Sequence, residues 1–171
     1  MKLLLAVAPE RFRDEELETP KRVFEEAGID VDIASTVAGT CTGMLGATAE
    51  AAMAFDDVDP DDYAGIVVVG GAGSQEHLWG SDILLALVRS FFEQGKVVAA
   101  ICLAPVVLAR AGILAGRQAT VYRTPMSVAE MEKAGANLLE IPVVADMQIV
   151  TANGPPAAAQ FADIIITKLE C

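Results

Sequence analysis

Cysteine and cationic residues are scarce in this 171-residue chain, and each shortage excludes a class of protein. The three cysteines, Cys41, Cys102 and Cys171, are odd in number and widely spaced, which is not typical of a disulfide scaffold. Lys and Arg total 12 against 24 Asp and Glu, so the net charge is −12. A nucleic-acid-binding protein needs cations to neutralise phosphates. We therefore expect no disulfide framework and no nucleic-acid partner.

Long hydrophobic runs are also missing. No run reaches the roughly 18–20 apolar residues of a membrane span. The apolar residues Leu3–Val7 are followed at once by the charged stretch Glu10–Glu16, where a signal peptide would need small residues. We expect a cytoplasmic protein with reduced cysteines and no membrane partner. Because 53 % of the residues are apolar, disorder is excluded.

Short apolar runs alternate with helical patterns along the chain. Ile66–Val69 and Val97–Ile101 are continuously apolar, as strands covered on both faces of a parallel sheet are. Strands that alternate with helices indicate βαβ units, so we predict one doubly wound α/β domain over residues 1–171, with helices on both faces of the sheet. For residues 35–55 a β-ribbon and a partly helical segment both stay open. The other expected strands are Leu3–Val7, Asp30–Ala34, Ala119–Tyr122 and Ile149–Thr151, and the expected helices are Asp14–Ala27, Ser81–Gln94, Pro105–Ala111, Ser127–Ala134 and Pro156–Leu169.

Two loops follow the buried strands, where ligands bind in such sheets. The first, Gly70–Gly73, lacks the G-x-G-x-x-G spacing of a dinucleotide site, so it is better suited to bring backbone N–H groups close to a reacting oxygen. The second begins at Cys102, at the end of one strand and just before a helix. A helix N-terminus favours a thiolate and lowers its pKa. On this local pattern alone, a reactive cysteine and a buried core cysteine are equally acceptable.

Several stretches together resemble the ThiJ/PfpI superfamily over essentially the whole chain. The resemblance implies a flavodoxin-like sandwich that is usually a homodimer or higher homo-oligomer, with a reactive cysteine on a strained elbow. The matching stretches are Phe12-Arg13-Asp14-Glu15-Glu16-Leu17 with Pro20, Val67–Gly71, Gly95–Cys102 with Pro105, Ala111–Leu114 and Asn153–Pro155.

The resemblance also implies site residues. Cys102 matches the family cysteine, and Glu16 matches a buried glutamate that hydrogen-bonds it. Gly70 and Gly71 match a glycine pair that supplies an oxyanion-type amide, together with the amide of Leu103. A protonated Glu16 would donate to the sulfur and lower the thiol pKa, whereas an ionised one would raise it. The two groups should therefore titrate as a coupled pair.

The chain departs from the family pattern at several positions. Leu103 stands where the protease-like branch has histidine, Ala104 replaces a glycine, and Arg13 replaces a second glutamate. Tyr122 lies in the stretch where deglycase-like members can place a histidine, and Asn153 replaces an arginine. An acylating Cys–His pair therefore lacks its usual base.

His77, the single histidine, follows the glycine loop beside Glu76. Either residue could line the pocket, within its own chain or across a dimer interface as in some family members, or could be an ordinary exposed or interfacial helix residue. One histidine and three scattered cysteines form no ligand cluster, so we expect no metal and no cofactor.

These features favour a cysteine nucleophile that acts on a small reactive carbonyl or a glycated adduct, in the manner of a glyoxalase or deglycase. A non-enzymatic, redox-responsive or chaperone-like stress protein is the alternative, which the missing histidine favours. An intracellular cysteine peptidase is a weaker alternative because Leu103 supplies no base.

Overall fold

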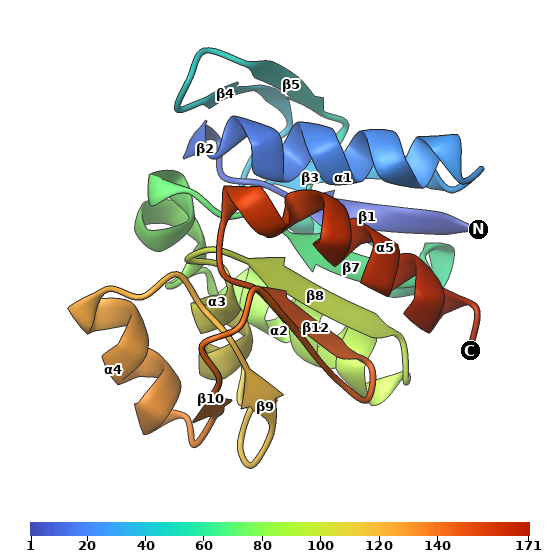
Figure 1. Cartoon of the computed structure of the whole chain (residues 1–171). Helices are drawn as coiled ribbons and strands as arrows, with labels where there is room; N and C mark the ends of the chain where they lie inside the picture. Colours follow the sequence, from blue (N-terminus) through green and yellow to red (C-terminus); the bar gives the residue numbers. More distant parts are fainter.

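A seven-stranded sheet forms the centre of the computed structural model, which describes residues 1–171 (Figure 1). Its strand order is β11-β12-β8-β7-β1-β3-β6, and all pairs are parallel except β11 with β12. The mostly parallel, doubly wound sheet predicted from the alternating pattern is confirmed. The strands are β1 (Lys2–Ala6), β3 (Asp30–Ser35), β6 (Met53–Ala54), β7 (Gly65–Val68), β8 (Val97–Ile101), β11 (Val143–Asp146) and β12 (Ile149–Ala152).

Helices cover both faces of this sheet. On one face α1 (Asp14–Glu26) packs beside α5 (Ala158–Leu169), and on the other lie α2 (Asp82–Glu93) and α3 (Pro105–Arg110) (Figure 1). α4 (Pro125–Lys133) packs outside α3.

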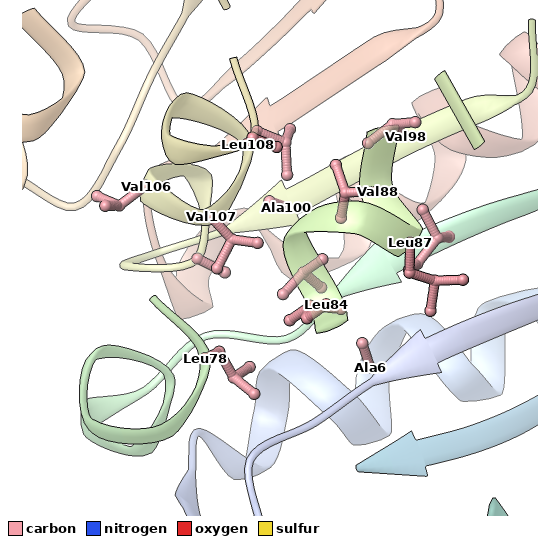
Figure 2. Packing of buried hydrophobic residues seen from close by; sticks show 14 of the residues in the cluster. Ala6, Leu78, Leu84, Leu87, Val88, Val98, Ala100, Val106, Val107 and Leu108 are labelled. Carbon is pink, nitrogen blue, oxygen red and sulfur yellow. The ribbon is translucent and has the colours of Figure 1, made fainter. Parts of the chain in front are cut away.

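Alternate residues of the buried strands enter two separate cores, because successive side chains of a strand point to opposite faces. In β1, Leu3 and Leu5 join the core under α1 and α5, whereas Leu4 and Ala6 join the core under α2 and α3. Figure 2 shows the second core, in which Leu84 and Val88 of α2 and Leu108 of α3 pack over Val98 and Ala100. Both faces are apolar, which explains why β1, β7 and β8 have continuous rather than alternating apolar sequences.

A β-hairpin stands beside the start of α1, and the ribbon alternative for residues 35–55 is the correct one. β4 (Gly39–Gly43) pairs antiparallel with β5 (Thr48–Ala51), and β2 (Glu10–Phe12) adds to β4 as a parallel strand. β2 was not predicted; it lies within the charged stretch Glu10–Glu16.

The prediction of a strand over Ala119–Tyr122 is largely wrong. Only β9 (Gln118–Ala119) is a strand, and it pairs with β10 (Asn137–Leu138) outside the main sheet. The sheet instead ends with β11, whose place beside β12 was not predicted. None of the helices combines the length and the apolar character that a membrane span requires.

The strands that follow β1 in the sequence are added to the sheet first on one side of β1 and then on the other. β3 lies on one side of β1, and β7 and β8 follow on the other, so the loops after β1 and β7 diverge at this point. Ligands of open α/β sheets bind in such a crevice at the carboxyl ends of the strands. The loop after β8, which begins with Cys102, adjoins the same crevice.

Candidate active site

Cys102 follows the last residue of β8 in a left-handed backbone conformation, with φ of 65°. Residues other than glycine rarely adopt this conformation, and it persists only where surrounding contacts enforce it. Here the N–H of Cys102 donates to the carbonyl of Ala152 at 2.9 Å, and its carbonyl accepts from the N–H of Tyr122 at 2.8 Å. The backbone of this elbow is therefore fixed on both sides.

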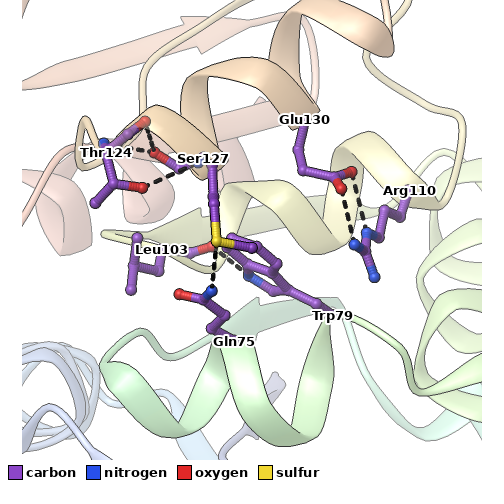
Figure 3. A network of polar contacts seen from close by, with 8 residues as sticks. Gln75, Trp79, Leu103, Arg110, Thr124, Ser127 and Glu130 are labelled. Carbon is purple, nitrogen blue, oxygen red and sulfur yellow. Dashed lines mark hydrogen bonds and ion pairs between the residues drawn. The ribbon is translucent and has the colours of Figure 1, made fainter.

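The next residue is anchored through its own carbonyl. The indole Nε1–H of Trp79 donates to the Leu103 carbonyl at 2.8 Å (Figure 3). The guanidinium of Arg110 lies over the Trp79 ring, 5.5 Å from its centre, and forms two hydrogen bonds to Glu130 of α4. These contacts tie the elbow to α3 and α4.

Glu16, in the first turn of α1, is completely buried. Neither of its carboxyl oxygens has a partner with full hydrogen-bond geometry. Burial raises the pKa of Glu16 to about 8, against the smaller lowering effects of the Cys102 thiol, the Arg13 charge and the N–H of Gly70. Glu16 is therefore a neutral acid below that pH, which is the protonated form that can donate to the sulfur.

Gly70 shows how closely Glu16 and Cys102 approach each other. A Cβ placed on Gly70 would lie 2.5 Å from Oε1 of Glu16 and 2.6 Å from Cβ of Cys102, distances that real Cβ atoms do not show. Only glycine fits between the acid and the nucleophile. Gly71 has φ of 109°, and its carbonyl accepts from the Ser74 hydroxyl at 2.7 Å, so its N–H is held in place.

The expected lowering of the Cys102 pKa is not found. Burial raises the pKa of the thiol to about 12, and the negative charge of an ionised Glu16 is the second cause. The N–H groups of Gly71 and Leu103 lower it by less. Helix α3 has only six residues, and its N-terminus does not compensate for desolvation. The two acids thus lose their protons in two separate steps and carry one negative charge between about pH 8 and 12.

A cavity of about 200 Å³ opens above the sulfur. Four of the predicted site residues line this cavity: Gly71, Cys102, Leu103 and Tyr122. Glu16 and Gly70 lie beneath it, next to Cys102. Two further lining side chains, Arg13 and Met44, were not predicted to lie at the pocket; the remaining lining residues are Ala72 and Pro155.

Asn153 lies in a neighbouring cavity of about 420 Å³. Tyr122 lines both cavities and is about half exposed, so it forms the wall between them. Arg123 and Glu140 face the larger cavity as an ion pair with a nitrogen–oxygen distance of 3.5 Å. Asn153 is thus adjacent to the thiol pocket without lining it.

Glu76 and His77 do not line the thiol pocket of their own chain, which corrects one of their two functional interpretations. They lie on a π-helical turn, where Glu76 pairs with Arg11 and Nε2 of His77 lies 3.1 Å from Oε1 of Glu10. The ligand atoms of Glu10, Glu76 and His77 lie within 4.8 Å of one another, a group missed by an analysis that counted only histidine and cysteine. All three side chains are at least partly exposed, and the guanidinium of Arg11 already neutralises part of their charge.

The family model of the DJ-1/PfpI family matches residues 1–168. The chain belongs to this family. A ThiJ/PfpI domain protein from Brachyspira murdochii has a solved structure with a TM-score of 0.94 and 31 % sequence identity, covering 99 % of this chain and 96 % of that one. The flavodoxin-like sandwich expected of the family is therefore the observed fold.

Two DJ-1/PfpI relatives illustrate the range of similarity. An uncharacterized protein of Methanocaldococcus jannaschii is 48 % identical over 99 % of this chain and 82 % of its own length. A deglycase of Thermococcus kodakarensis is 36 % identical over 91 % of each chain. The relatives support a role within the DJ-1/PfpI family and leave the substrate to be argued from the site.

Proposed function

We propose that this DJ-1/PfpI protein uses Cys102 as a nucleophile toward small reactive carbonyls or glycated adducts, in a glyoxalase- or deglycase-like reaction. The observation that carries the proposal is the pairing of Cys102, held in a left-handed conformation, with a completely buried Glu16 whose carboxyl oxygens have no partner with full hydrogen-bond geometry. Relatives named deglycases, such as the one from Thermococcus kodakarensis, support the choice of carbonyl chemistry.

In the proposed reaction with a 2-oxoaldehyde, the sulfur of Cys102 adds to the aldehyde carbon and the carbonyl oxygen takes a proton, which gives a hemithioacetal. The N–H groups of Gly71 and Leu103 face the sulfur, where they can stabilise negative charge on the adding oxygen. Transfer of a proton from the aldehyde carbon to the neighbouring ketone carbon, with Glu16 as the carrier, oxidises the first carbon and reduces the second. Water then hydrolyses the thioester, which releases a 2-hydroxy acid and the free thiol.

The burial of Glu16 suits this role. A general acid–base group works best when its pKa lies near the operating pH. Burial brings the pKa of Glu16 to about 8, so it can give and take a proton near neutral pH. The cavity volume of about 200 Å³ is below the roughly 300–1,000 Å³ of drug-sized sites, which restricts the substrate to a few carbon atoms.

The test is methylglyoxal consumption by the purified protein, without glutathione and with a chelator present. We expect D-lactate or L-lactate to accumulate with the wild type and the Cys41→Ser variant, and no lactate with Cys102→Ser. Cys41 is a matched control because it is a second buried cysteine that does not line the thiol pocket. Lactate formation that persists in Cys102→Ser would refute the assignment.

A redox-responsive function is the second candidate, because Leu103 provides no histidine base beside the thiol. Hydrogen peroxide would convert the Cys102 thiolate to a sulfenate with release of water, and a second equivalent would give a sulfinate. Selective gain of two oxygens at Cys102 by a protein that consumes neither methylglyoxal nor a glycated amino acid would favour this function. A dominant disulfide between Cys102 and Cys41 would instead indicate a thiol switch.

A further inference from the structure

Arg13 is the one charged side chain that lines the thiol pocket. The other lining residues are Met44, Gly71, Ala72, Cys102, Leu103, Tyr122 and Pro155, so no carboxylate faces the cavity directly. This local cation contrasts with the net charge of −12 of the whole chain. A small anion that reaches the pocket therefore meets an environment unlike the rest of the surface.

The guanidinium of Arg13 is held in position and still has free donors. The backbone N–H of Arg13 donates to the Gly70 carbonyl at 2.9 Å, and the side-chain Nε–H of Arg13 donates to Oε2 of Glu15 at 2.8 Å. An arginine has five N–H donors, so the four on its terminal nitrogens stay available for a second carboxylate. The side chain is one-third exposed, which leaves it open to a ligand in the cavity.

The guanidinium also lies close to the reacting groups. Its hydrogen bond to Glu15 is the main cause that raises the pKa of Arg13, and the charges of Glu16 and Cys102 add to the effect. A substrate whose carbonyl carbon contacts the sulfur therefore places a group a few atoms away beside Arg13. A carboxylate at that place would gain a charge-assisted, bidentate pairing.

We propose that Arg13 makes the thiol pocket selective for carbonyl compounds that carry a carboxylate a few carbons from the reacting aldehyde. This inference rests on the proposed function of Cys102. Its substrate class is the 2-oxoaldehyde with a carboxylate tail, which adds one water and becomes a 2-hydroxy dicarboxylate. The aldehyde carbon is oxidised and the ketone carbon reduced within the same molecule, so no external oxidant or reductant is required.

A pair of alkylating reagents tests the anion preference without relying on turnover. Iodoacetate and iodoacetamide form the same kind of bond to sulfur and differ in charge, so their rate ratio at Cys102 cancels any change in the thiol pKa. We expect this ratio to fall about three- to fivefold in Arg13→Gln, the range of a partly exposed ion pair. The same ratio at the exposed Cys171 serves as the internal reference.

Arg11→Gln is the matched control, because Arg11 lies two residues away and pairs with Glu76 outside the pocket. An unchanged iodoacetate-to-iodoacetamide ratio in Arg13→Gln, or an equal fall in Arg11→Gln, would overturn the inference. The substrate class is tested with 4,5-dioxopentanoate against 2-oxopentanal, its uncharged counterpart of equal length. We expect a higher kcat/KM for the charged compound in the wild type, with the preference lost in Arg13→Gln through a raised KM.

The two assays separate this inference from the function it rests on. If the protein consumes neither dicarbonyl, nor methylglyoxal, nor a glycated amino acid, while the alkylation ratio still falls in Arg13→Gln, the proposed function is refuted and the anion subsite stands. If both dicarbonyls are consumed equally well by the wild type and by Arg13→Gln, the proposed function stands and the carboxylate selectivity is refuted.

Discussion

Cys102 and Glu16 are neighbouring acids, of which Glu16 is completely buried and Cys102 is largely buried, and burial raises the pKa of both. Loss of the first proton leaves one negative charge on the pair, which lies on either the carboxylate or the sulfur. The form that can attack a carbonyl has the charge on the sulfur and the proton on Glu16. The N–H groups of Gly71 and Leu103 favour this form, because both lower the pKa of the thiol.

Gly70→Ala tests the close approach of the pair. The new Cβ would collide with Glu16 and Cys102, so we expect the free energy of unfolding to fall by about 1–3 kcal/mol. Methylglyoxal consumption should fall as well, because the acid or the thiol must move. Gly80→Ala is the control, since a Cβ at Gly80 meets nothing within 4 Å. Equal effects of the two substitutions in denaturant unfolding would contradict the geometry.

The start of α1 connects the site to the β4–β5 hairpin. Asp14 is buried, and its carboxylate accepts from the N–H groups of Leu45 and Ala47 at 3.0 and 2.9 Å. These bonds fix the hairpin turn, whose residue Met44 lines the thiol pocket. One helix therefore supplies the buried acid, Glu16, and also holds one wall of the cavity.

Asp14→Ala should remove the contacts that hold the β4–β5 turn beside the thiol pocket. Loss of two hydrogen bonds to a buried carboxylate should cost about 1–3 kcal/mol of unfolding free energy, and the amides of Leu45 and Ala47 should exchange hydrogen faster. Asp14→Asn retains one acceptor oxygen and should lie between the wild type and Asp14→Ala. Unchanged exchange at both amides in Asp14→Ala would show that the turn is held by other contacts.

The elements that could be predicted from the sequence are those with a strong local pattern. Val97–Ile101 was predicted with the bounds it has in the structure, and the helix predicted over Ser81–Gln94 is α2, which Ser81 caps by accepting from the N–H of Leu84. β11 was missed because its strand character depends on its antiparallel pairing with β12. The short strand β2 was missed for the same reason, since its pairing with β4 is not visible in a charged stretch.

The site was predictable to the extent that it follows the strand ends. Cys102, Gly71 and Leu103 could be placed because they lie in the loops after buried strands, and their roles and that of Glu16 followed from the resemblance to the ThiJ/PfpI superfamily. Arg13 and Met44 come from a helix start and a hairpin turn, and only the tertiary arrangement brings them to the thiol. The direction of the thiol pKa was wrong because burial, which no local pattern measures, outweighs the nearby amides.

At the scale of the whole molecule, the buried acid links stability to pH. Glu16 has a folded pKa of about 8 against an ordinary value of 4.5, so the folded protein binds this proton more tightly than the unfolded chain does. Its contribution is fully present below pH 4.5 and is lost as the pH rises to about 8.

Glu16→Gln removes this titration. Relative to the variant, the wild type should lose about 1.4 kcal/mol of unfolding free energy for each pH unit within that window. The measurement is urea unfolding of both proteins between pH 4 and 9, with Glu18→Gln as a control on an exposed position of the same helix. Parallel stability curves for the wild type and Glu16→Gln would contradict a buried, neutral Glu16.

The central claim, that Cys102 and Glu16 share one proton, is tested most directly by the rate of Cys102 alkylation with iodoacetamide between pH 5 and 10.5. In the wild type the rate should rise through about pH 8, where the pair loses its first proton, and then level off. In Glu16→Gln the thiol stays buried but no longer faces the charge of an ionised Glu16, so a single rise should be centred above the ordinary thiol pKa of 9.0 and below about 12. Profiles with the same midpoint in the two proteins would show that Cys102 ionises independently of Glu16.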